Sequence, residues 1–123
     1  MFETAVIDTL AQDVPEPQWA LEAAQKLKFD TVQLHCMEDS PSNTTKGHEG
    51  QRRTELLFTC YAKNGAAARN LCRRVTDALR NHTDAFGQYT LVGWSLGSET
   101  GGFDKATNMY FRDFTYNATY QEP

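Results

Sequence analysis

The stretch TNMYFRDFTYNATY, residues 107–120, is dense in threonine, tyrosine and phenylalanine. Residues of these types pack well on a pleated, half-buried surface, so the stretch predicts one long strand. Successive side chains of a strand point to opposite faces. The bulky face, which we expect to point inward, carries Tyr110, Arg112, Phe114, Tyr116, Ala118 and Tyr120. The other face, which we expect to meet solvent or a partner, carries Met109, Phe111, Asp113, Thr115, Asn117 and Thr119. Such a strand is either paired in a sheet or forms an exposed edge that invites another chain.

Two earlier segments, residues 29–36 and 52–62, alternate between apolar and polar side chains and predict two further strands. Their apolar faces carry Val32, Leu34, Cys36, Leu56, Phe58 and Cys60. Residues 38–50 between them are polar and contain no aliphatic side chain, so they cannot offset the entropy of becoming ordered. We therefore expect an antiparallel pair of strands joined by a long mobile hairpin loop.

Helical patterns flank these strands. Residues 66–80 repeat apolar side chains at helical spacing, with Asn64 as a helix cap, and residues 2–10 do so more briefly. Residues 17–28 begin with a proline and are rich in alanine, so they also predict a helix. Residues 90–96 predict a short strand, and the glycine-rich residues 97–102 a flexible turn. The order predicts one α+β domain over residues 1–123, with an antiparallel or mixed four-stranded sheet and the helices packed on one face.

Composition limits the functions to consider. A formal net charge of -4 argues against nucleic acid as the main partner, because phosphate binding requires a basic surface, so we expect no sequence-specific nucleic-acid binding. No apolar run is long enough to span a bilayer, and the start lacks the pattern of a signal peptide. We therefore expect a soluble protein made in a cytoplasm, with no membrane partner and with three reduced cysteines.

No motif specifies a reaction. There is no phosphate-binding loop or dinucleotide fingerprint, and the histidines, cysteines and carboxylates lack the compact spacing of a metal site. Cys36 and Cys60 lie on apolar strand faces, whereas a catalytic cysteine needs a partly exposed, electropositive site. We expect no catalytic residue, cofactor or metal, and so not an enzyme. The arginine side of residues 66–80 could bind an acidic partner, although a solvated helix face is the commoner meaning of such a pattern.

The order of elements is informative at this point. The segment TELLFTCYA at residues 54–62 precedes the amphipathic helix, FDTV stands at residues 29–32, and YFRDFTYNATY closes the pattern at residues 110–120. The chain resembles the tail terminator proteins of long-tailed, lambda-like bacteriophages, from about residue 29 onward and in the first helix. It departs from that family at residues 17–28, where the family usually has a short strand and a turn.

The resemblance implies a late virion protein that forms a hexameric ring, stops polymerisation of the tail tube and presents a surface to the head connector. Its partners would be copies of itself, the tail tube protein and the head-tail connector protein. It would lie at the head-proximal end of the virion tail after assembly in the host cytoplasm. Three alternatives stay open: another neck, tail-completion or head-tail joining protein, a small α+β enzyme or ligand-binding domain, and a regulatory domain that dimerises through the last strand.

We expect the protein interface to involve the long loop with its flanking residues and the outer side of the last strand. The loop group consists of Glu38, Asp39, Lys46, His48, Arg52 and Arg53. The strand group consists of Asp113, Asn117 and Thr119.

Overall fold

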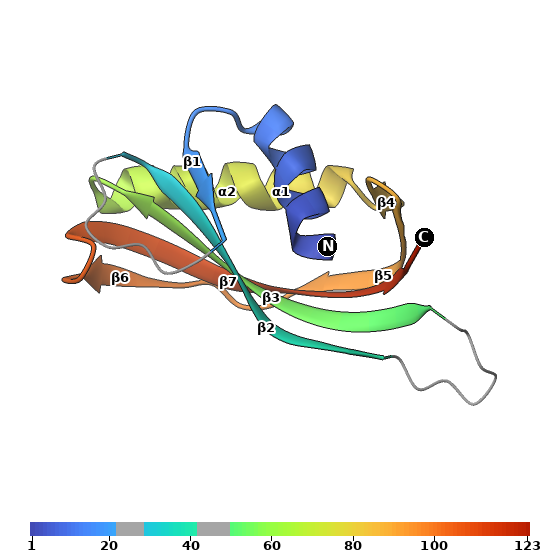
Figure 1. The fold of residues 1–123 in the computed structure, drawn as a ribbon. Coiled ribbons are helices and arrows are strands. Elements are labelled where there is room, and N and C mark those ends of the chain that lie inside the picture. The colour runs from blue at the N-terminus through green and yellow to red at the C-terminus, as the bar shows by residue number, and fades with distance from the viewer. Residues whose placement is uncertain (22–28, 42–49) are drawn as a thin grey trace.

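A computed structural model describes residues 1–21, 29–41 and 50–123. Over these residues the chain forms two helices and a seven-stranded sheet, and both helices lie on the same face of the sheet (Figure 1). The elements are α1 (Phe2–Asp13), β1 (Gln18–Ala20), β2 (Thr31–Pro41), β3 (Gln51–Ala62), α2 (Gly65–Asn81), β4 (Ala85–Phe86), β5 (Tyr89–Leu96), β6 (Thr100–Asp104) and β7 (Met109–Gln121). The predicted α+β class with helices on one face is confirmed.

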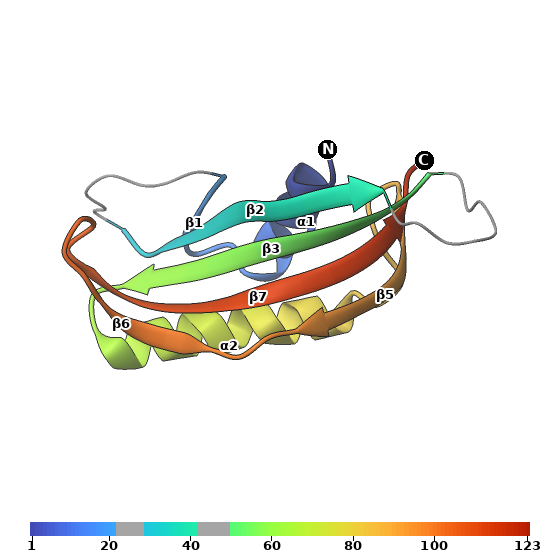
Figure 2. The ribbon, with the colours of Figure 1, turned by 90° about the horizontal axis from the view of Figure 1, so that it is seen from below.

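The strands follow the order β1-β2-β3-β7-β5-β4, and β6 also pairs with β7. The β1–β2 pairing is parallel and the others are antiparallel, so the sheet is mixed. Seen from the side opposite the helices, β3 and β7 run through the middle of the sheet, with β1 and β2 on one side of them and β5 and β6 on the other (Figure 2). The prediction of four strands was an undercount, because β1, β4 and β6 are only two to five residues long.

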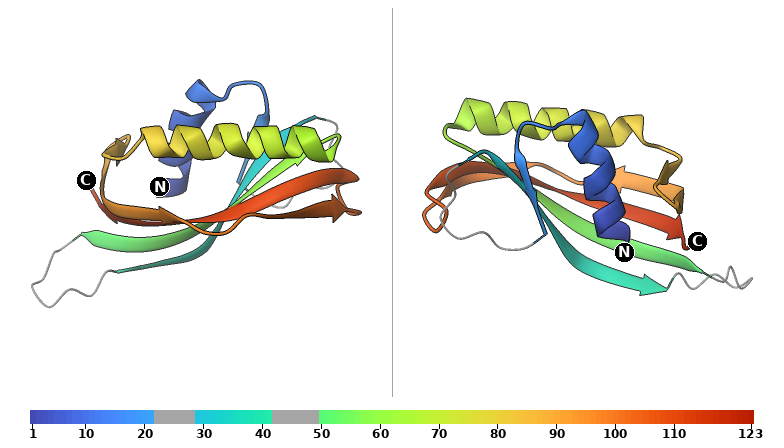
Figure 3. Two further views of the ribbon diagram at one scale, coloured as in Figure 1. Left: turned by 180° about the vertical axis from the view of Figure 1, so that it is seen from behind. Right: turned by 45° about the horizontal axis from the view of Figure 1, so that its top comes forward.

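Helix α2 lies lengthwise over the sheet, with α1 crossing beside it (Figure 3). Its start is fixed by Asn64, whose side chain accepts a hydrogen bond of 2.8 Å from the backbone N–H of Ala67, as the sequence predicted. Leu71, Cys72, Val75 and Leu79 face the sheet and are buried. The helix is therefore held by the burial of its apolar stripe on β3 and β7.

Strand β7 supplies the centre of the core. Phe114, Tyr116, Ala118 and Tyr120 are buried under the helices as predicted, and Phe114 stacks on Phe58 of β3 with 5.1 Å between the ring centroids. The inward face was wrongly predicted at the start of the strand. Tyr110 is 42% exposed. Its ring packs against Phe103 of β6, and Phe103 is itself 48% exposed, so this contact does not bury Tyr110.

The helix predicted for residues 17–28 is wrong at Gln18–Ala20, which form β1, and residues 22–28 lie outside the described part of the chain. The backbone N–H of Gln18 donates to the carbonyl of Asp30 at 2.8 Å, and the indole N–H of Trp19 donates to the carbonyl of Val14 at 3.0 Å. These bonds come from neighbours brought close by folding, so local helix propensity gives no sign of them.

The glycine-rich segment predicted as a turn is a strand over part of its length. Thr100–Asp104 form β6, and Gly97 marks the point where the chain leaves β5. A Cβ atom on Gly97 would lie 2.1 Å from Oγ1 of Thr115, and one on Gly101 would lie 2.9 Å from the carbonyl oxygen of Phe111. These glycines therefore allow the chain to approach β7 closely.

The β2–β3 hairpin is antiparallel as predicted, but its strands are longer than the sequence indicated. Glu38–Pro41, assigned to the loop, continue β2, because they pair with residues 52–55 of β3. Residues 42–49, the remainder of the predicted mobile loop apart from Gly50, lie outside the described residues.

Tyr116 gives a test of the core. Its ring is fully buried, its hydroxyl has no hydrogen-bond partner among the described residues, and burial raises the pKa of the phenol well above its ordinary value. We expect Tyr116→Phe to leave the free energy of unfolding unchanged or to raise it by up to about 1 kcal/mol, because a buried hydroxyl without a partner is unfavourable. Urea unfolding at neutral pH measures this.

The same substitution tests the raised pKa. An unfolded tyrosine loses its proton near pH ~10, whereas folded Tyr116 keeps it to higher pH, so stability falls as pH rises above the unfolded value. One such residue contributes up to about 1.4 kcal/mol per pH unit to that decline. Tyr116→Phe should make the decline shallower between about pH 10 and 11.5. An equal decline in both proteins would contradict the buried, unpartnered phenol.

Candidate interaction surface

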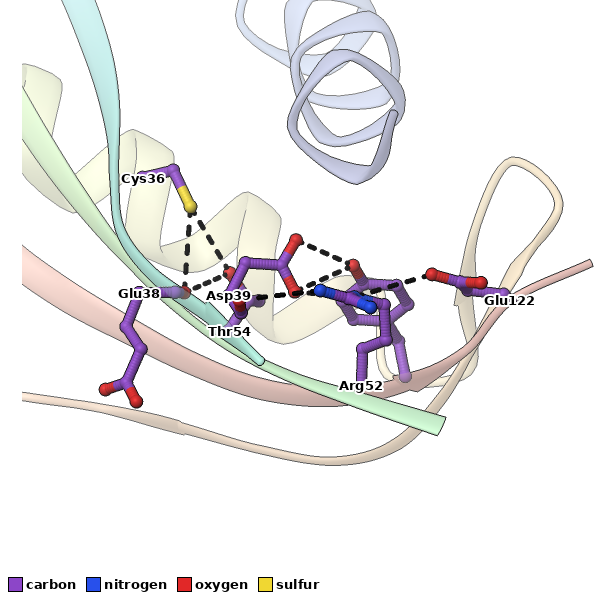
Figure 4. Close-up of polar contacts among 7 residues, drawn as sticks. Cys36, Glu38, Asp39, Arg52, Thr54 and Glu122 are labelled. Atoms are coloured by element: carbon purple, nitrogen blue, oxygen red, sulfur yellow. Dashed lines mark hydrogen bonds and ion pairs between the residues drawn. The ribbon is translucent and has the colours of Figure 1, made fainter. Parts of the chain in front are cut away.

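The side chains of Asp39, Arg52, Tyr120 and Glu122 meet where β2 and β7 end and β3 begins (Figure 4). Arg52 Nε donates to Asp39 Oδ1 at 2.8 Å and lies 3.4 Å from Glu122 Oε1. The hydroxyl of Tyr120 donates to Asp39 Oδ2 at 3.3 Å, and burial, followed by the charge of Asp39, raises the pKa of that phenol. Arg52 and Asp39 were predicted to meet a partner. In the structure they hold three strands together.

A bulge turns Glu38 away from this cluster. The β2–β3 register shifts between Cys36 and Glu38, and the hydroxyl of Thr54 donates to the carbonyl of Glu38 at 2.9 Å. Successive strand residues alternate between faces, so the carboxylates of Glu38 and Asp39 point to opposite sides of the sheet (Figure 4), and the bulge sets which of the two faces each one takes. Met37, at the bulge, is left 52% exposed.

The face of the sheet opposite the helices, here called the open face, brings together four of the predicted interface residues. Glu38 lies opposite Glu55, which pairs on its other side with Asn117, and Arg53 lies opposite Thr119. A shallow hollow of about 220 Å³ lies over β5 and β7 and is lined by Arg53, Gly93, Trp94, Ser95, Asn117, Ala118 and Thr119. This polar, uncovered surface fits contact with another protein.

The remaining predicted interface residues are elsewhere. Asp113 lies on the open face but near the other end of β7, where Thr59 faces it from β3 and the hydroxyl of Thr100 donates to its carboxylate. Lys46 and His48 fall in residues 42–49, outside the described residues. The structure therefore joins the two predicted groups only through Glu38, Arg53, Asn117 and Thr119.

A second charged region lies between α2 and the segment that joins β5 to β6. This cavity of about 510 Å³, here called the arginine groove, is lined by Arg69, Arg73, Thr76, Arg80, Leu96, Gly97, Glu99, Arg112 and Phe114. The helical spacing of Arg69, Arg73 and Arg80 indicated the helix side of it. Arg112 and Glu99 could not be placed there from sequence, because β7 and the segment that joins β5 to β6 come to lie beside α2 only on folding.

Glu99 is held as a carboxylate in the arginine groove. The thiol of Cys72 donates to Glu99 Oε1 at 2.9 Å, and Arg112 Nη2 lies 3.4 Å from Glu99 Oε2. The hydrogen bond from Cys72, and then that from Arg112, lower the pKa of Glu99. One negative charge therefore stands among four arginines.

Cys36 and Cys60 lack the lowered pKa of a nucleophile. The hydrogen bond with Cys72 and burial raise the pKa of Cys60, and burial raises the pKa of Cys36. A reactive cysteine requires a lowered pKa. In the described part of the chain no three metal-ligating side chains gather, and no helix there is long and apolar enough to cross a membrane.

Comparison with known proteins identifies the fold. No family model matches the sequence, and no curated protein matches it significantly. Among solved structures, a chain from the virion of a native gene transfer agent particle matches with a TM-score of 0.60 and 12% sequence identity. The match covers 98% of this chain and 94% of that chain, so the two share a fold over nearly their whole lengths.

The strand-end cluster yields a prediction. Tyr120→Phe removes the hydroxyl that donates to Asp39, and we expect the free energy of unfolding to fall by about 1 kcal/mol. In a chain that already carries Asp39→Asn the same change should cost less, because the acceptor has lost its charge. Urea unfolding of the four proteins measures the coupling, and an equal cost in both backgrounds would show that the charge of Asp39 adds nothing to the hydrogen bond.

Proposed function

We propose that this chain is a structural protein of a phage-like virion, without catalytic activity. The observation that carries the proposal is the fold shared, over 98% of the chain, with a component of a gene transfer agent virion. The surface is consistent with it: no helix covers the open face (Figure 2), and the hollow on that face is lined by Arg53, Ser95, Asn117 and Thr119 among others, which suits contact with other protein subunits. The partners would be other virion proteins, and the location the virion.

Within that class we propose the tail terminator: a hexameric ring at the head-proximal end of the tail that caps the tube and receives the head connector. The sequence resemblance over residues 29–120 supports this assignment. The structure removes one conflict with it, because residues 18–20 form a short strand where the sequence had indicated a helix. The chain also carries two regions of different charge, the open face around Glu38 and Glu55 and the arginine groove. Two such regions would suit a closed ring of identical subunits.

The pairing of the last strand argues against the alternative of a regulatory domain that dimerises through it. Strand β7 pairs with β3 along almost its whole length, and on its other side with β6 at residues 109–113 and β5 at residues 116–121. A strand in the middle of a sheet offers no edge to another chain. A neighbouring neck or head-tail joining protein stays an alternative, because the same fold would serve it.

Deletion of the gene from the virus or particle-producing element that encodes it separates these roles. We expect overlong tail tubes and heads without tails in electron micrographs, because an uncapped tube continues to polymerise. Tails of normal length that fail to join heads would identify the neck protein instead. Complete, infectious or transfer-competent particles would contradict a virion role, and complementation with the intact gene is the control.

A further inference from the structure

The arginine groove gathers positive charge on an acidic chain. Arg69, Arg73 and Arg80 share a face of α2 with Thr76, and Arg112 approaches from β7. Four arginines and one carboxylate line the groove, although the whole chain carries a net charge of -4. Like charges that line one groove repel one another, so an anionic group from outside would stabilise it.

The groove's arginines are incompletely paired. Arg80 lies 3.4 Å from Asp77, and Arg112 reaches Glu99 only through one nitrogen at 3.4 Å, while its buried Nε has no hydrogen-bond partner among the described residues. Over that same part of the chain, neither Arg69 nor Arg73 makes an ion pair. Planar guanidinium groups with free donors match the two oxygens of a carboxylate.

A complementary acidic feature lies at the other edge of the sheet. Glu38 of β2 and Glu55 of β3 are directly opposite on the open face, and like charges in that position destabilise a strand pair. Neither makes an ion pair with any described residue, although Arg53 lies two positions from Glu55 along the same face. A cation from outside the subunit would offset this repulsion.

The positions of the acidic pair and of the arginine groove indicate which partner could bind in the groove. The acidic pair lies on β2 and β3 near one edge of the sheet, whereas the groove borders β5 and β6 at the other edge (Figure 2). Two different patches at opposite edges cannot satisfy each other within one subunit. They can do so between successive copies of the chain, and such head-to-tail contacts produce a ring when the rotation closes.

We propose that Glu38 and Glu55 of one copy bind in the arginine groove of the next copy. The proposal rests on the ring function given above and names the contact that closes the ring. Nucleic acid fits the groove less well than a carboxylate pair, because a polyanion would extend beyond the groove and meet the net negative charge of the chain.

Charge reversal tests the contact. Sedimentation velocity over a concentration series should show self-association of the natural chain that weakens with added salt. Arg73→Glu and Glu55→Arg should each lower the association constant at least about tenfold, because each places like charges together. The double variant Arg73→Glu with Glu55→Arg should restore association, because it exchanges the two charges. Circular dichroism confirms that each variant is folded.

Arg74→Glu is the matched control. Arg74 is also on α2 and the substitution changes the net charge equally, but Arg74 pairs with Glu16, outside the groove. Reversal variants that associate as the control does, or a natural chain that stays monomeric at every concentration, would overturn the proposed contact. Either result leaves the virion role to be decided by the gene deletion. Loss of binding to a short DNA duplex by Arg73→Glu, with self-association unchanged, would also overturn it and identify phosphate as the ligand.

Discussion

The pairing of β7 on both of its sides is the constraint on which the rest of the structure depends. β3 pairs with it from Gln51 opposite Gln121 to Ala62 opposite Tyr110, while β5 and β6 divide its other side between them. A doubly paired strand must bury its bulky face, and Phe114 and Tyr116 become the surface on which α2 packs. Because that face is covered, contacts with other molecules fall to the open face and to the two edges of the sheet.

Much of this could be predicted from residue patterns alone. The alternation in residues 110–120 and 52–62 predicted the two central strands, and the apolar stripe of residues 66–80 predicted α2. Both predictions succeeded because the pattern of apolar residues in a long periodic segment indicates which of its faces is buried. The short strands β1, β4 and β6 escaped prediction. These strands form through hydrogen bonds to neighbours that are distant in sequence. Gly97 and Gly101 indicate a turn when the sequence is considered alone, because only the fold shows that β7 lies against them.

The interaction surface was less predictable than the fold. Arg52 and Asp39, which we expect to meet a partner, also bind each other within the subunit, because the hairpin register places them side by side and Tyr120 adds a third contact. The charges that are paired within the subunit depend on strand register, and the bulge at Met37 places Asp39 on the helix-covered face and Glu38 on the open face. The arginine groove joins segments that are close only after folding, so sequence indicated its helix side alone.

We propose that this chain is a building block of a virion and that opposite edges of its sheet join it to its own copies. Electron cryomicroscopy of the assembled particle would decide this. We expect a ring of this chain between tail tube and head, with Glu38 and Glu55 of each copy in the arginine groove of its neighbour. Particles in which no density corresponds to this chain would rule out the virion role.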